Sequence, residues 1–553
     1  MITPAELLAV PVFAALSHAQ RARIAARAGD IHVNAGEWIV HDGDPVYFWA
    51  LLSGEVEALK TVAGETRQAT TFDPGEYFGE VPLMLGSVSF LGLRALKPSR
   101  LVRVDQIDFH AMVTDCAEAG ALLAATLVRR VGFIREAYAA AKLTQATIVG
   151  DRYDFACHEI RDFLARNQIV FEWLDPSDPG DAESIPPTLR AAAKYPAVVL
   201  PDDRVLVAPS LRNLAESLQL QTQPNSDVYD VVIIGGGPAG LAAAVYGGSE
   251  GLRTMMIERE APGGQAGTSS RIENYLGFPG GVSGGDLANR ALLQAKRFGT
   301  EIVVTRCVTA LDSTPERHVV RLDGGAAVQT RAVVLAMGVS WRKLETKGAE
   351  RFVGRGVYYG AARTEALGTR GKDIFLIGGG NSAGQAAMFF SSYARRVTLL
   401  VRGASLTKSM SYYLIEQLRT KDNVAVETQT VLVSVGGGAH IETIVTRDES
   451  TGAETERSAD ALFTFIGADA ETSWLPAEID RDERGYIRTG HEIVGWVLER
   501  PPFALETRIP GVFAAGDVRS NSIKRVASGV GEGSMVIAFI HEYLATRAVP
   551  LNV

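Results

Sequence analysis

The chain has 553 residues, too many for one ordinary hydrophobic core, so several domains are expected. Hydrophobic residues make up 46% and charged residues 22%, a composition typical of soluble globular proteins and not of disordered ones. The net charge of -9 argues against nucleic acid or an anionic membrane as the main partner.

Two further features bear on location and on thiol chemistry. The sequence has no run of about 20 apolar residues and no charged-then-apolar leader pattern, so a cytoplasmic protein is expected. Its three cysteines, Cys116, Cys157 and Cys307, lie far apart, and none belongs to a CxxC. Neither a metal site nor a local redox dithiol is therefore predicted.

The N-terminal region is predicted to be a small β-roll followed by a helix. Residues from about 31 to 105 form short alternating segments broken by Gly and Pro, and apolar residues at helical spacing follow from about 117 to 143. The segments LLSGEVEAL and PGEYFGEVPLML, with the closing helix, resemble the cyclic-nucleotide-binding domain. The resemblance assigns residues 1–143 to such a domain, with a nucleotide effector as its partner.

In that family a phosphate cassette begins at the segment that matches Phe78-Gly79-Glu80. Backbone amides and an arginine neutralise the cyclic phosphate, and the glutamate holds the ribose hydroxyl. Gly79 and Glu80 are thus candidate ligand-binding residues, but Ser89 stands where the arginine is expected, and Arg94 comes several residues late. Losing that contact costs about 1.5–3 kcal/mol. A roll kept for docking or dimerisation is therefore favoured over a cyclic-nucleotide sensor.

Residues 144–222 have the order strand, helix, strand, hairpin, helix. The segments are ATIVGD, FACHEIRDFLARN, VFEWLD, KYPAVVLPDDRVL and SLRNLAESL. This order resembles the glutaredoxin-like thioredoxin fold, with Pro196 at the family's cis-proline position. Where the family's CxxC would begin the first helix, only Cys157 is near, and it shares a helical face with Ile160 and Leu164. A buried core cysteine and a docking role are expected.

From Asp227 a dinucleotide-binding pattern begins. VYDVVIIGGGPAGLAAAVYGGSEGLRTMMIERE predicts an apolar strand, a glycine-rich turn, a helix and a second strand that ends at Glu258. Gly235, Gly237 and Gly240 fill the GxGxxG positions, which serve a tight turn, close approach to a pyrophosphate and close helix–strand packing. Glu258 is placed to bind a ribose hydroxyl.

A second motif of the same kind lies in DIFLIGGGNSAGQAAMFFSSYARRVTLLVRG. Gly378, Gly380 and Gly384 again follow an apolar strand and open a helix. The next strand ends at Arg402 instead of an acid, and an arginine there can accommodate a 2′-phosphate, so NADPH is predicted over NADH. Lys408 would add positive charge. The residues expected to hold NADPH are Gly378, Gly380, Asn381, Ser382, Arg402 and Lys408.

More specific motifs resemble the thioredoxin-reductase group of flavoproteins over residues 227–553. PGGQAGTSSRIENYLGFPGGVSG, AVVLAMGVSWRKL and IPGVFAAGDVRSNSIKRVASGVGEGSMVIAFIHEYL match its flavin-binding segments, with Met337 replacing a threonine. The resemblance implies FAD, with Asp517 at the ribityl or pyrophosphate portion and a helix N-terminus under the flavin ring, where its positive end stabilises reduced flavin. The implied FAD residues are Gly235, Gly237, Gly240, Glu258, Gln265, Asn274, Asp517, Arg525, Val526 and Ala527.

The expected fold is therefore multidomain. A β-roll and a small thioredoxin-like α/β domain precede two Rossmann-like α/β dinucleotide-binding domains, and a homodimer is expected. The NADPH-binding domain, residues 341–465, is predicted to interrupt an FAD-binding domain made of residues 227–340 and 466–553.

The segment GVYYGAARTEA departs from the family pattern Gly-Val-x-Tyr-Cys-Ala-x-Cys-Asp. Gly360 takes the place of the first cysteine, Arg363 that of the second and Thr364 that of the acid. Disulfide reduction needs a sulfur nucleophile, a resolving sulfur and a proton donor. Cys307 is the one cysteine in this half and is predicted on a flavin-domain strand.

The sequence thus predicts an NADPH-dependent FAD oxidoreductase that passes electrons from the flavin directly to an unidentified acceptor. Gly360 would leave space over the flavin and Arg363 would attract an anionic partner, or both simply mark a lost site. Two alternatives stay open. One is a disulfide reductase that uses Cys157 or a partner's thiols, and the other is a non-enzymatic, nucleotide-responsive redox sensor.

Overall fold

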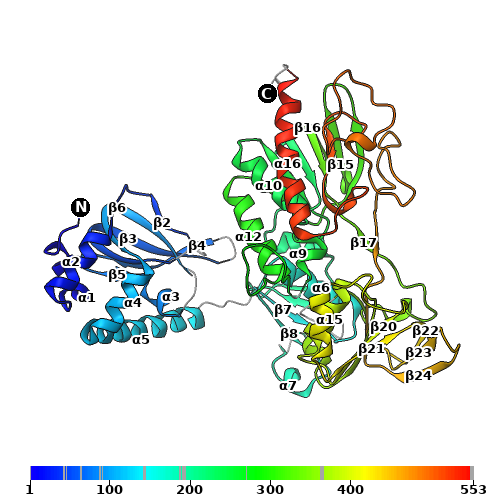
Figure 1. The fold of residues 1–553 in the computed structure, drawn as a ribbon, viewed down its shortest axis with the longest axis horizontal. Coiled ribbons are helices and arrows are strands. Elements are labelled where there is room, and N and C mark those ends of the chain that lie inside the picture. The colour runs from blue at the N-terminus through cyan, green and yellow to red at the C-terminus, as the bar shows by residue number, and fades with distance from the viewer. Residues whose placement is uncertain are drawn as a thin grey trace. The chain divides into compact units, whose positions relative to one another are not determined.

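The computed structural model describes residues 2–41, 44, 46–62, 65–85, 89, 91–140, 145–185, 189, 195–269, 271–360 and 366–547. The chain divides into two compact units, Met1–Leu143 and Thr144–Val553. Figure 1 shows the first unit in blue and the second in cyan to red.

The first unit is the expected antiparallel β-roll with flanking helices. Its strand order is β1-β6-β3-β4, with β2 paired to β6 and β5 to β3. The strands are β1 (Gly29–Val33), β2 (Trp38–Val40), β3 (Phe48–Val62), β4 (Glu65–Phe72), β5 (Tyr77–Phe78) and β6 (Gly92–Val104). The helices are η1 (Glu6–Ala9), α1 (Pro11–Ala14), α2 (His18–Arg27), α3 (Glu80–Leu85), α4 (Gln106–Asp115) and α5 (Ala117–Ala140).

Within the described residues, no single helix combines the length and apolarity needed to cross a membrane. One helix pair, Gln106–Asp115 with Ala117–Val128, passes a test of length and composition together, but it is bent by 111°.

The second unit begins with the predicted thioredoxin-like domain. Its sheet has the order β10-β9-β7-β8, with β7 parallel to β8 and antiparallel to β9, and the Tyr195–Pro196 bond is cis. A short helix, α7, stands between β8 and β9 and was not predicted. The elements are β7 (Ala146–Val149), α6 (Phe155–Arg166), β8 (Phe171–Leu174), α7 (Pro179–Ala182), β9 (Ala197–Val199), β10 (Val205–Val207) and α9 (Leu211–Ser217).

A seven-stranded sheet follows and forms what we call the first module. Its order is β13-β12-β11-β16-β15-β14, with β27 from the end of the chain beside β16. Helices α10, α12 and α16 pack on one face through a core that includes Val231, Ala243 and Ile537. The strands are β11 (Val228–Ile234), β12 (Thr254–Ile257), β13 (Glu301–Val303), β14 (Val308–Ser313), β15 (His318–Leu322), β16 (Ala327–Leu335) and β27 (Val512–Ala514). The helices are α10 (Pro238–Ser249), α11 (Gly264–Gly267), α12 (Gly284–Arg297), η2 (Asp323–Gly325), η5 (Gly490–Glu492), η6 (Gly516–Val518) and α16 (Val526–Ala545).

The second module contains a parallel sheet in the order β18-β25-β19-β20-β21 and a small antiparallel sheet, β22-β23-β24. A two-stranded ribbon of β17 and β26 connects it to the first module. The strands are β17 (Ser340–Trp341), β18 (Val357–Tyr359), β19 (Asp373–Ile377), β20 (Arg396–Val401), β21 (Val424–Thr428), β22 (Thr430–Gly436), β23 (Thr443–Asp448), β24 (Glu454–Ser458), β25 (Ala461–Thr464) and β26 (Ala468–Asp469). The helices are η3 (Glu350–Phe352), η4 (Leu367–Thr369), α14 (Asn381–Phe390) and α15 (Tyr412–Arg419).

Candidate functional site

The glycine turn between β11 and α10 has the geometry that its sequence predicts. Gly235 has a φ of +105°, and a Cβ there would lie 2.5 Å from the Ala336 carbonyl oxygen. A Cβ on Gly240 would collide with the Gly235 carbonyl oxygen. A Cβ on Gly237 would approach no atom closer than Gly264 Cα, at 4.0 Å. Packing therefore explains the first and third glycines, whereas the second leaves open space in which a pyrophosphate can approach the backbone.

The turn between β19 and α14 repeats this arrangement in the second module. Gly378 has a φ of +143°, and a Cβ there would lie 2.6 Å from the Phe465 carbonyl oxygen. A Cβ on Gly384 would lie 2.9 Å from Met410 Cε, whereas one on Gly380 would be no closer than 3.8 Å to the Ser409 carbonyl oxygen. The second glycine is again the one that packing does not require.

A cavity of about 490 Å³ lies where the two modules meet. The beginnings of helices α10, α14 and α16 all contribute to its wall, through Pro238, Ser382 and Val526. Helix N-termini carry partial positive charge and unpaired N–H groups, so the cavity suits a ligand with phosphates and a ring that becomes anionic when reduced. The predicted site residues that line it are Gly235, Gly237, Glu258, Gln265, Gly360, Ser382, Asp517, Arg525 and Val526.

Glu258, directly after β12, lies at the bottom of the glycine turn with 8% of its surface exposed. Its two carboxylate oxygens accept hydrogen bonds from the Gly236 and Glu260 amides, at 2.7 and 3.0 Å. Burial raises the pKa of this carboxyl group, while the two amides act in the opposite direction. The carboxylate is thus held beside the first turn, where a ribose hydroxyl of a bound dinucleotide would reach it.

The opposite end of the cavity is formed by the C-terminal segment. Arg525 is the N-cap of α16, and Asp517, on the short helix η6, lines the same wall. Burial raises the pKa of the Asp517 carboxyl group, and the nearby Lys524 opposes this. Gln265 donates a hydrogen bond of 2.6 Å to the Val339 carbonyl, which fixes its amide at the crossing between the modules.

Gly360 lies at this crossing, immediately after β18, with a φ of +85°. A Cβ there would contact Trp341 at 3.7 Å and the Thr268 hydroxyl at 3.8 Å, so space is available and the backbone conformation is what favours glycine. Trp341 and Phe465, which also line the cavity, meet edge to face with centroids 6.4 Å apart. Arg363, the other residue at a missing cysteine position, lies outside the described residues.

Other predicted residues lie near the glycine turns without lining the cavity. Asn381 accepts a hydrogen bond from the Ser411 amide at 2.7 Å, which ties the start of α14 to the loop after β20. Arg402 and Lys408 are exposed on that loop, and Asn274 is exposed on the loop after α11. The predicted residues outside the cavity lining are Gly240, Asn274, Gly378, Gly380, Asn381, Arg402, Lys408 and Ala527.

A second cavity, of about 670 Å³, adjoins the first and shares Gln265, Trp341 and Lys524 with it. Tyr486 supplies a second ring to its wall, and Arg484 a further cation. Lys524 donates to the Tyr486 hydroxyl at 3.3 Å and lies over that ring, 4.4 Å from its centroid. The second cavity therefore combines aromatic surface with positive charge next to the first.

No cysteine belongs to the described lining of either cavity. Cys157 is fully buried in the core of the thioredoxin-like domain with Ile160 and Leu164, as predicted, and burial raises the pKa of its thiol to about 12. Cys307 is exposed just before β14. Neither position gives a reactive thiolate beside the cavity.

The sequence analysis did not identify three cavity residues from the thioredoxin-like domain. His158, Asp162 and Arg166 of α6 line the same wall as the first glycine turn. Their spacing of four residues places them on one face of the helix, opposite the buried face of Cys157. This polar stripe was the available signal, but a polar helical face is usually exposed to solvent.

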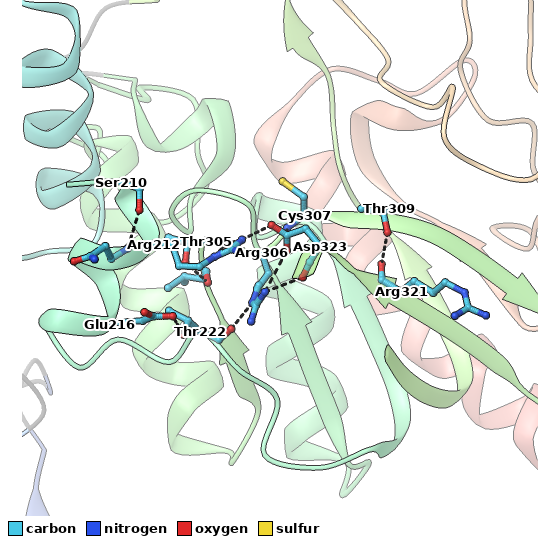
Figure 2. Close-up of polar contacts among 12 residues, drawn as sticks. Ser210, Arg212, Glu216, Thr222, Thr305, Arg306, Cys307, Thr309, Arg321 and Asp323 are labelled. Carbon is cyan, nitrogen blue, oxygen red and sulfur yellow. Dashed lines mark hydrogen bonds and ion pairs between the residues drawn. The ribbon is translucent and has the colours of Figure 1, made fainter. Parts of the chain in front are cut away.

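The same domain is fastened to the first module at a second place, away from the cavity. Figure 2 shows Arg212 of α9 reaching toward Thr305 and Asp323. The Arg212 guanidinium donates to the Thr305 carbonyl at 2.8 and 3.2 Å and forms an ion pair with Asp323. Arg306, beside them, is buried and donates to the Thr222 carbonyl at 2.6 Å.

In the first unit, the predicted ribose-binding glutamate already has a partner. Glu80 is fully buried, and its Oε1 accepts a hydrogen bond of 2.6 Å from Arg130 of α5. The Tyr77 hydroxyl bonds Thr126 of the same helix at 2.8 Å. Gly79 has a φ of +88° and packs against the Tyr47 carbonyl. The late arginine, Arg94, bonds Glu57 through two nitrogens at 2.6 and 2.8 Å instead of reaching the cassette.

Comparison with known proteins agrees with this geometry. Residues 229–533 match the pyridine nucleotide-disulphide oxidoreductase family, and residues 30–116 match the cyclic nucleotide-binding domain. Thioredoxin reductase of Treponema pallidum (strain Nichols) is 33% identical over 318 residues, which are 58% of this chain and 98% of that protein. Thioredoxin reductase of Bacillus subtilis (strain 168) is 32% identical over 320 residues, which are 57% of this chain and 95% of that protein. One component of alkyl hydroperoxide reductase from Staphylococcus aureus (strain Mu50) is 30% identical over 341 residues, which are 62% of this chain and 64% of that protein.

Among solved structures, thioredoxin reductase of Lactococcus lactis in its FR conformation is similar, with a TM-score of 0.52 and 27% identity. The similarity covers 57% of this chain and 99% of that one. Fold and site together define a flavoprotein oxidoreductase with two dinucleotide-binding modules. The chain belongs to the pyridine nucleotide-disulphide oxidoreductase family and carries an N-terminal cyclic nucleotide-binding domain. Its cofactors are FAD and NADPH, as predicted.

Proposed function

We propose that the protein oxidises NADPH and passes the electrons from FAD directly to an acceptor, without a cysteine pair of its own in the path. The observation that carries the proposal is the cavity between the modules, which both glycine-turn helices line and which has no cysteine in its described wall. FAD, when bound, accepts a hydride from the nicotinamide and returns electrons to the acceptor.

The residues of the chain are suited to hold and orient the two dinucleotides. The amides at the starts of α10 and α14 would bind phosphates, and Glu258 would fix a ribose. We further propose that the flavin domain consists of residues 227–340 and 466–553 and the NADPH domain of residues 341–465. The ribbon of β17 and β26 supports this division, because it is the place where the chain passes twice between the modules.

We also propose that the acceptor enters through the second cavity. Trp341 and Tyr486 offer aromatic surface to a planar acceptor, and Arg484 and Lys524 favour a negatively charged one. Arg484→Gln is expected to raise KM for a sulfonated quinone about threefold or more, as loss of one charge contact of about 1 kcal/mol would. KM for a neutral quinone should stay unchanged. An equal rise for both would place the acceptor elsewhere.

The central test is anaerobic. NADPH should bleach the visible absorbance of the bound flavin, and a quinone or ferricyanide should restore it. Thioredoxin and small aromatic disulfides should not be reduced faster than oxygen is. The triple variant Cys116→Ser, Cys157→Ser, Cys307→Ser should keep NADPH-to-quinone activity.

The second candidate function is a disulfide reductase, which the thioredoxin reductases among the relatives favour. Reduction of a disulfide substrate that Cys157→Ser alone abolishes would establish this function and refute a thiol-free path. A flavin that NADPH reduces but that no acceptor reoxidises would instead support a redox sensor.

A further inference from the structure

Helix α6 of the thioredoxin-like domain forms part of the cavity in which the family's FAD cofactor is held. His158, Asp162 and Arg166 line the cavity together with Gly235 and Glu258 of the first module. The domain has no cysteine on this side, since the thiol of Cys157 is buried in the domain's own core. Its contribution to the cavity is therefore not explained by thiol chemistry.

Arg166, the last residue of α6, is held firmly at the wall. Its guanidinium donates to Glu260 Oε2 at 2.9 Å and to the Ala261 carbonyl at 3.1 Å. It also lies 3.5 Å from Asp162 one helical turn earlier. Only 16% of the side chain is exposed. A cation fixed in this way loses little further conformational entropy when a ligand binds beside it.

The position of Arg166 identifies which half of FAD it would meet. Its partners, Glu260 and Ala261, follow Glu258 closely in sequence, and an acid at the end of the second strand of this motif binds the adenosine ribose. The flavin end of the cavity is marked instead by Asp517 and Arg525. The polar stripe of α6 therefore lies at the adenosine end.

This wall is an addition to the family site. The family match begins at residue 229, after α6 has ended. The T. pallidum relative is matched over 98% of its length by 318 residues of this chain. The part of the site shared with such a protein is thus complete without α6.

We propose that the thioredoxin-like domain is a structural part of the FAD site, in which Arg166, supported by Asp162, binds the AMP half of the cofactor. A domain whose fold is associated with redox exchange would here act through a charged helix face. The inference concerns cofactor binding and holds whatever the electron acceptor is.

Titration of the apoprotein with FAD tests the proposal. Arg166→Ala should weaken FAD binding about tenfold, the effect of losing one charge-assisted contact. FMN, which lacks the AMP half, should bind the variant and the natural protein equally. Unchanged FAD affinity in Arg166→Ala would overturn the proposal.

A matched control separates ligand contact from domain docking. Arg212→Ala removes another arginine that joins the same domain to the first module, through Thr305 and Asp323, but that does not line the cavity. FAD affinity should stay within about twofold of the natural protein in this variant. An equal loss in both variants would show that docking matters and that Arg166 does not contact FAD.

Hydrogen exchange gives a readout that needs no variant and covers the case in which Arg166→Ala does not fold. Addition of FAD to the natural apoprotein should slow exchange of the α6 amides, because the ligand closes the face on which His158, Asp162 and Arg166 lie. Addition of FMN should leave α6 unchanged. Exchange of α6 that does not respond to FAD would refute the proposal.

Discussion

Arg402 follows β20 and is exposed on the loop that leads to Lys408. Among the residues that the structure describes, its guanidinium has no ion-pair partner, so it is available to a 2′-phosphate. Arg402→Ala should weaken NADPH about tenfold or more, since a charged hydrogen bond contributes about 1.5–3 kcal/mol. NADH affinity should hardly change. Both affinities can be measured by anaerobic titration, and equal losses would show that Arg402 does not read the 2′-substituent.

The three cysteines should differ in reactivity because the thiolate is the nucleophile. Burial raises the pKa of the Cys157 thiol to about 12, so at pH 8 almost none of it is ionised, and its alkylation should accelerate only as pH rises toward that value. Exposed Cys307 should react first. Mass spectrometry after iodoacetamide treatment of the native protein measures this, with denatured protein as the control. Rapid alkylation of native Cys157 at pH 8 would mean that α6 opens readily.

Helix α5 carries the contacts that occupy the cassette of the roll. To bind a ribose hydroxyl, Glu80 would have to give up Arg130, and separating such a buried pair is costly. With Ser89 in place of the phosphate arginine, cyclic AMP and cyclic GMP should bind weakly or not at all. Calorimetry checks this, and micromolar affinity would show that α5 can release Glu80. Arg94 would not explain such binding, because Glu57 holds it.

Regular elements were predicted well wherever the sequence had a clear period. The expected helix FACHEIRDFLARN became α6, and the two glycine motifs became strand–turn–helix units with their glycines in the expected roles. Helix α7 was missed because its four residues, PGDA, have the composition of a turn. The ribbon of β17 and β26 has two residues per strand, too few for any periodicity.

The site was predictable only as far as local chemistry determines it. Glycines that must avoid a Cβ clash, such as Gly235 and Gly240, can be identified from the motif alone. The cavity contacts of α6 depend on how two domains pack, and no local pattern encodes that packing. Asn274 illustrates the converse case, because its motif matches the family while its loop leaves it exposed and outside the cavity lining.

For the whole molecule, the first expectation is firm retention of FAD. The purified protein should be yellow and should release FAD, not FMN, on denaturation, because the glycine turn and Glu258 are built for a dinucleotide. Chromatography of the released flavin decides between the two. Failure to bind any flavin after reconstitution would contradict the cofactor assignment.

The homodimer remains a prediction at this scale. A monomer has a mass of 59.2 kDa, so light scattering should give about twice this value if two chains associate. A mass that stays at that of one chain over a wide concentration range would show that the FAD site works within a single chain.

The flavin sheet also determines when the protein can acquire its cofactor. Strand β27 pairs with β16, and α16 packs on α10, so the last part of the chain completes a structure that β11 begins. A ribosome adds about 5–20 residues per second from the N-terminus. The wall containing Asp517, Arg525 and Val526 is therefore synthesised long after the first glycine turn. Until release, the nascent chain can offer FAD only half a site, and any truncation before α16 should yield a colourless protein.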